Sequence, residues 1–84
     1  MNIKEAIKII HENKLQYYNM NEERNNRENE VVLRHENDKW IVYVTDERAS
    51  KVTNSQYVYS NEEEALDDFI DRLMVWNSLK NKQI

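Results

Sequence analysis

Carboxylates are the side chains in this sequence whose types and spacing most readily do chemistry. They occur in short runs: one directly after an apolar stretch, one at the start of a helical pattern, and one in a polar segment rich in asparagine. Ionised carboxylates accept strong hydrogen bonds from lysine and arginine, so such runs can recognise a basic partner. The candidate partner-binding residues are Glu22, Glu23, Asp46, Glu47, Arg48, Glu62, Glu63, Glu64, Asp67 and Asp68.

Some of these carboxylates also have the spacing that a metal site on a helix would use. Glu64 with Asp68, and Asp67 with Asp71, stand four residues apart and would share a helix face. A calcium or magnesium site, however, normally has a ligand loop around the ion, and this sequence contains no glycine to form its sharp turn. A solvated helix face with a favourable dipole interaction is the simpler interpretation, and we predict no metal and no cofactor.

The residue patterns of an enzyme are missing from the sequence. The chain contains no cysteine and no glycine, which excludes a thiol nucleophile, a disulfide framework and a glycine-rich phosphate loop. His35 is expected opposite Trp40 on a strand, where packing against the aromatic ring is a simpler role than general base. Carboxylate pairs arise easily in so acidic a chain and have little weight. We therefore predict a protein that is not an enzyme.

Length and charge narrow the class of protein further. A chain of 84 residues leaves room for one domain, which we expect to span residues 1–84. Its formal charge of −4 disfavours nucleic acid as a partner, because phosphate backbones repel an acidic domain. The N-terminal stretch MNIKEAIKII has neither the uninterrupted apolar segment of a signal peptide nor the length of a membrane span. We expect a soluble, cytoplasmic protein with no membrane partner.

The first third of the chain predicts a helix followed by less regular structure. Ile3, Ala6, Ile7 and Ile10 recur at helical spacing after Asn2, a good N-cap, and predict a helix to about residue 14. Residues 15–20 predict a short strand, although the helix could extend into them. Residues 21–29 form an exposed connector, which is either a mobile loop or a binding loop.

The centre of the chain predicts a β-hairpin with a defined register. A two-residue turn at Asn37 and Asp38 places His35 opposite Trp40, and it likewise pairs Glu36 with Lys39, Leu33 with Val42 and Val31 with Val44. One face of the hairpin is then nearly all apolar. The opposite face carries Val32 and Tyr43, together with Arg34 and Ile41, and could meet water or a partner.

The last part of the chain predicts one more strand and a long helix. The stretch SQYVYS alternates as a strand does, and Ser60 with Glu63 fits a capping box at the start of the helix. Leu66, Phe69, Ile70, Leu73 and either Trp76 or Asn77 form its apolar face. The predicted fold is α+β: an antiparallel meander of three or four strands with an N-terminal and a C-terminal helix packed on it. The expected core includes Ile7, Ile10, Leu33, Trp40, Val42, Phe69 and Leu73.

The same order of elements is similar to that of the double-stranded RNA-binding domain. Those domains hold RNA phosphates with lysines at the start of their last helix, whereas this chain has Glu62, Glu63 and Glu64 there. The charge has the wrong sign for RNA. Function depends on the site and not on the fold, so we reject RNA binding.

Three stretches together resemble the small immunity proteins of bacterial polymorphic toxin systems. They are the apolar N-terminal helix, NDKWIVYVTDERAS and SNEEEALDDFIDRL, and the resemblance is to an α+β family with a tryptophan strand followed by an Asp-Glu-Arg segment. Trp40 matches the strand aromatic, and Asp46, Glu47 and Arg48 match the charged segment. The resemblance implies a cytoplasmic protein that binds and neutralises a cognate toxin non-covalently, and the acidic balance suits a toxin with a basic surface.

Two questions stay open at the level of sequence. Asp46, Glu47 and Arg48 either fix the turn after the strand, with Arg48 folded onto Glu47 or a nearby carboxylate, or present acceptors to a partner. The alternative function is a small cytosolic adaptor or regulatory binding module. Such a module would be a monomer or a homodimer, the homodimer joined across the face that carries Val32, Ile41 and Tyr43.

Overall fold

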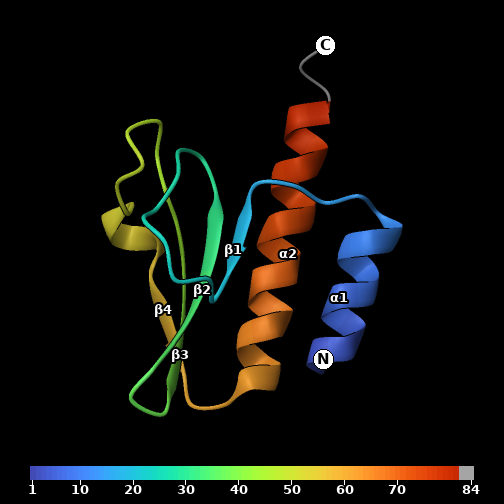
Figure 1. The fold of residues 1–84 in the computed structure, drawn as a ribbon, viewed down its shortest axis with the longest axis vertical. Coiled ribbons are helices and arrows are strands. Elements are labelled where there is room, and N and C mark those ends of the chain that lie inside the picture. Colours follow the sequence, from blue (N-terminus) through green and yellow to red (C-terminus); the bar gives the residue numbers. More distant parts are fainter. Residues whose placement is uncertain (82–84) are drawn as a thin grey trace.

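Two helices and a four-stranded sheet form the fold, which a computed structural model describes for residues 1–81. The helices lie on the same side of the sheet, so the molecule has two layers (Figure 1). The α+β class and the two packed terminal helices are as predicted. In chain order the elements are α1 (Ile3–Glu12), β1 (Tyr18–Met20), β2 (Val31–Glu36), β3 (Lys39–Val44), the 3₁₀ turn η1 (Thr53–Ser55), β4 (Tyr57–Tyr59) and α2 (Glu62–Asn81).

The sheet is mixed, and the prediction of a purely antiparallel meander is wrong at its first pair. The strand order is β1-β2-β3-β4, with β2–β3 and β3–β4 antiparallel, but β1 pairs parallel with β2, placing Tyr18 beside Val31. The reason is the path of residues 21–30, which carry the chain back along the sheet before β2 begins (Figure 1). Residues 18–20 are a strand because α1 ends at Glu12, where Asn13 forms the C-cap.

The hairpin of β2 and β3 has the predicted register. His35 lies opposite Trp40, and the pairs Glu36–Lys39, Leu33–Val42 and Val31–Val44 are all present. Asn37 and Asp38 turn the chain with φ values of 49° and 64°. Asparagine and aspartate tolerate this left-handed conformation better than most residues, which lets a glycine-free chain form the tight turn that matches the sheet twist.

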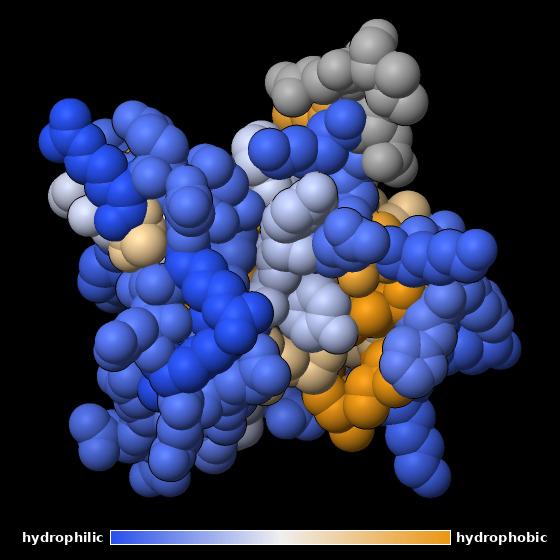
Figure 2. Space-filling model, turned by 45° about the horizontal axis from the view of Figure 1, so that its top comes forward, coloured by the Kyte–Doolittle hydropathy of each residue, from blue (hydrophilic) through white to orange (hydrophobic). Residues whose placement is uncertain are grey.

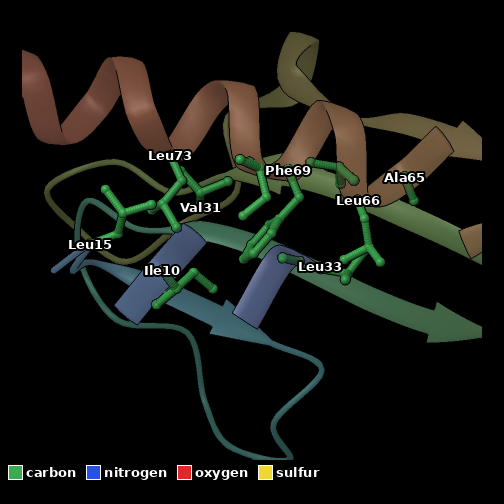
Figure 3. Packing of buried hydrophobic residues seen from close by; sticks show 11 residues of the cluster. Ile10, Leu15, Val31, Leu33, Ala65, Leu66, Phe69 and Leu73 are labelled. Atoms are coloured by element: carbon green, nitrogen blue, oxygen red, sulfur yellow. The ribbon is translucent and has the colours of Figure 1, made fainter. Parts of the chain in front are cut away.

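The core lies between α2, α1 and the inner face of the sheet. Leu66, Phe69 and Leu73 of α2 point toward Val31 and Leu33 of β2 (Figure 3). The apolar face predicted for α2 is confirmed, with Trp76 partly buried and Asn77 buried.

The prediction that Ile7 and Trp40 belong to the buried core is wrong. Ile7 is 42% exposed, and Ala6 with Ile10 supplies the buried face of α1 instead. Trp40 only packs against the edge of the core, and its ring stacks on His35 with a centroid distance of 4.1 Å. The helix α1 packs closely against its neighbours, and the small side chain of Ala6 fits this close contact. Ile7 lies on the side of α1 that is partly exposed to solvent.

The predicted N-cap of α1 is confirmed, whereas the predicted N-cap of α2 is wrong by one residue. Asn2 caps α1 as predicted, its side-chain oxygen accepting from the Glu5 amide at 2.8 Å. At α2 the cap is Asn61 and not Ser60, because Asn61 Oδ1 accepts from the Glu64 amide at 2.9 Å. A capping oxygen bonds the amide three residues on, so the shift of the cap moves its partner from Glu63 to Glu64.

The outer face of the sheet is partly covered, which corrects the prediction of an open half-polar surface. Val32 is fully buried there, because the connector of residues 21–30 runs along this face. The Tyr43 hydroxyl donates to Asn26 Oδ1 at 2.9 Å, and the Arg34 guanidinium donates to the Glu22 carbonyl. Val32 is therefore covered within the chain and does not contribute to the exposed part of this face. Neither helix within residues 1–81 has the length and apolar content to cross a membrane.

Candidate functional site

The ten predicted partner-binding residues occupy three separate places. Glu62 to Glu64, with Asp67 and Asp68, begin α2 beside the β2–β3 turn, at the lower end of the molecule in Figure 1. Residues 46–48 form the turn after β3 at the opposite end, and Glu22 and Glu23 lie in the connector on the outer face. The fold brings together the acidic residues of α2, but it keeps them apart from residues 46–48.

Asp46 fixes the turn that follows β3. Its Oδ1 accepts hydrogen bonds from the backbone amides of Arg48 at 2.8 Å and Ser50 at 3.0 Å. These two amides stabilise the ionised carboxylate and hold the pKa of Asp46 below its usual value. Among the ion pairs between residues 1–81 none involves Arg48, so the turn is fixed by Asp46 and not by an Arg48–Glu47 pair. The side chains of Glu47 and Arg48 are exposed and face solvent.

Two of the five carboxylates at the start of α2, Asp67 and Asp68, form ion pairs or hydrogen bonds within the chain. Asp67 contacts the N-terminal ammonium of Met1 at 2.6 Å. Asp68 accepts from Arg72 Nε at 2.9 Å and from the Tyr59 hydroxyl at 2.6 Å. Burial, together with this bond to Asp68, raises the pKa of Tyr59 to about 12. The remaining carboxylates of the run, Glu62 to Glu64, are exposed at the first turn.

The connector is held against the sheet by an ion pair that the sequence analysis missed. Glu30 has a side chain only 3% exposed, and Arg24 Nη2 contacts its Oε2 at 2.8 Å. Arg24 Nη1 also bonds Oε1 at 3.2 Å, and Nη2 bonds the Tyr18 carbonyl at 3.1 Å. The proximity of Glu30 keeps the pKa of Arg24 above its usual value. The only sequence signal was a carboxylate directly before an apolar strand.

Glu22 contributes to the same connector mainly through its backbone. Its amide donates to Asn19 Oδ1 at 2.6 Å, and Asn19 is itself fully buried. Its carboxylate lies 3.4 Å from Arg24 Nε, whereas Glu23 is exposed. Of the two predicted residues in the connector, Glu23 is therefore the one whose carboxylate forms no ion pair with residues 1–81.

A groove lies between the sheet and the C-terminal half of α2, and no sequence pattern predicted it. Its volume is about 400 Å³, and its apolar lining comes from Val31, Val44, Val75, Trp76 and Leu79. Trp76 is fixed by a hydrogen bond from its Nε1 to the Asn29 carbonyl at 3.0 Å. The groove opens at the end of the molecule that carries Asp46, because the neighbouring Thr45 also lines it.

Comparison with known proteins shows the family of this chain. A family model described as Immunity protein 59 matches residues 1–84. The chain belongs to the Immunity protein 59 family. This confirms the resemblance to small immunity proteins. No curated protein and no solved structure matches the chain.

The surface of this Immunity protein 59 chain is mainly polar. Within residues 1–81 no three histidine, aspartate or glutamate side chains come together as a metal site requires. Most of the face shown in Figure 2 is hydrophilic, with hydrophobic residues confined to a strip beside α1 and smaller areas. The exposed carboxylates and the apolar groove are two separate features of the surface of this Immunity protein 59 chain.

Proposed function

We propose that this protein neutralises a cognate bacterial toxin by forming a tight, non-covalent complex in the cytoplasm of the cell that produces both. The match of the Immunity protein 59 family model to residues 1–84 is the observation that carries the proposal. A surface rich in carboxylates supports it, because charge complementarity speeds the encounter with a basic partner. The protein acts by occupying the toxin and not by turning over a substrate.

Co-expression tests this function directly. Cells that express a candidate toxin domain from an adjacent gene should survive when the present protein is co-expressed and should die when its gene carries an early stop codon. An active-site variant of the toxin, harmless on its own, controls for the burden of expression. Equal survival with and without the protein would refute toxin neutralisation and favour the adaptor function.

The exposed carboxylates at the two ends of the molecule are proposed to act differently on the toxin. Glu62 begins α2 far from the groove, whereas Glu47 lies in the turn next to it. Charges at the rim of an interface act mainly on association, and charges in the desolvated centre act on dissociation. Asp46 and Asp68 are less available because they already bond within the chain.

Two charge reversals of the same chemistry separate these roles. Glu62→Lys should slow association and weaken its dependence on salt, with the dissociation rate nearly unchanged. Glu47→Lys should raise the dissociation rate, by about tenfold or more, as expected for loss of a contact in the desolvated part of an interface. Surface plasmon resonance on the inactivated toxin, at low and physiological salt, measures both rates. Identical effects of the two variants on both rates would contradict this assignment.

A further inference from the structure

Large apolar side chains of α2 are exposed to solvent along the groove. Val75 is 60% exposed and Leu79 is 51% exposed, and they lie one turn apart on α2. Together with the ring of Trp76 they form one continuous apolar wall, which faces Val31 and Val44 of the sheet. Single exposed aliphatic residues are common on protein surfaces, but a hollow lined by several of them marks a binding surface.

The residues that line this groove include two carboxylates, Glu30 and Asp71, and one guanidinium, Arg72, while Lys80 Nζ lies 5.1 Å from the centroid of the Trp76 ring. Arg72 lines the groove, but its Nε lies 2.9 Å from Asp68 Oδ1, so its charge is compensated. Glu30 also lines it and is compensated by Arg24 at 2.8 Å. Asp71 is the lining carboxylate that forms no ion pair with another residue in the range 1–81. It stands in a segment, residues 62–72, that contains six carboxylates and one arginine.

We infer that this groove receives an apolar side chain of the toxin, carried on a basic segment whose lysine or arginine contacts Asp71. This inference rests on the proposed function and names the surface that performs it. Burial of the apolar side chain against Val75, Trp76 and Leu79 supplies affinity, and a charge-assisted bond to Asp71 fixes the orientation of the segment. The charge argues against a second copy as the occupant, because each copy has a formal charge of −4.

A matched pair of substitutions tests the groove. Val58 is 54% exposed, close to the value for Val75, but it lies on β4 opposite Ile41, on the outer face of the sheet. Val75→Glu places a charge in the apolar groove, whereas Val58→Glu makes the same chemical change away from it. Val75→Glu should raise the Kd for the inactivated candidate toxin domain from an adjacent gene by about 30-fold, as for loss of an interface hot spot. Val58→Glu should leave the Kd within about twofold of the wild-type value.

The substitution Asp71→Asn tests the proposed contact between Asp71 and a basic residue of the toxin. It should raise the Kd by a smaller factor and reduce the dependence of binding on salt, because one charge-assisted contact becomes neutral. Thermal unfolding of all three variants should match the wild type, since the three substituted side chains are exposed.

The results of these experiments distinguish failure of the groove inference from failure of the proposed function. Wild-type protection together with unchanged binding of Val75→Glu would overturn the groove and leave the proposed function intact. Absence of any wild-type binding to the toxin would overturn both. Sedimentation that shows a wild-type dimer, abolished by Val75→Glu while toxin binding persists, would assign the groove to a second copy and refute the inference.

Discussion

Replacing Phe69 by alanine is expected to lower the free energy of unfolding by about 3 to 5 kcal/mol. Phe69 is fully buried at the centre of α2, and its ring meets that of Tyr18 edge to face at a centroid distance of 6.3 Å. The ring therefore joins α2 to β1, which pairs with only one strand, β2. Alanine would lose the transfer energy of the ring and leave a cavity that the surrounding layers cannot close.

Urea unfolding followed by circular dichroism measures this loss. Val75→Ala is the control on the same helix, because Val75 is 60% exposed, and it should change stability by no more than about 0.5 kcal/mol. Domains of this kind are stable by about 5 to 15 kcal/mol, so the Phe69 variant should retain only part of its stability. A loss below about 1 kcal/mol for Phe69→Ala would show that the core is not packed as described.

Replacing Arg24 by alanine is expected to cost a similar amount, about 3 to 5 kcal/mol, for a different reason. The change removes the cation from Glu30, whose side chain is only 3% exposed. A buried carboxylate without its cation is costly because it has lost water, and Glu30 would keep the Arg27 amide, 3.1 Å from its Oε1, as a hydrogen-bond donor but no positive charge. The connector would also lose the bond from Arg24 to the Tyr18 carbonyl, and with it part of the cover over Val32.

A double-mutant cycle separates the buried charge from lost packing. Glu30→Gln removes the carboxylate charge, so Arg24→Ala should cost clearly less in that background than in the wild type. Arg48→Ala is the control, because Arg48 is exposed and should contribute at most about 0.5 kcal/mol. Equal losses for Arg24→Ala and Arg48→Ala would contradict a structural role for the buried pair.

The β2–β3 hairpin and the buried face of α2 could be predicted from the sequence, because each depends on residues that are close together in the chain. The register of β2 and β3 follows from Asn37 and Asp38, which determine the turn, and from the alternation of apolar residues on either side of it. The buried face of α2 follows from helical spacing alone, which placed Leu66, Phe69 and Leu73 together. In both cases the residues that determine the structure lie within a few positions of one another.

Some predictions were wrong because two neighbouring residues have nearly equal preference for the same structural position. Ser60 and Asn61 are both good caps, and the structure selects Asn61 because α2 begins at Glu62. Ala6 and Ile7 both fit an apolar stripe of α1, and the close packing of the helix selects the smaller residue. The parallel direction of β1 could not be read at all, because it depends on the path of the connector.

By itself the sequence determined the α+β class, the hairpin, the face of α2 and the identity of the acidic residues. The tertiary structure alone decided which of these carboxylates remain exposed, since Asp46 bonds the amides of its own turn and Asp68 bonds Arg72. It also decided the groove, whose walls join Val31 and Val44 to Val75 of a distant segment. Periodicity reports which side of one element is apolar. A surface between elements exists only once their relative positions are set by packing of the core.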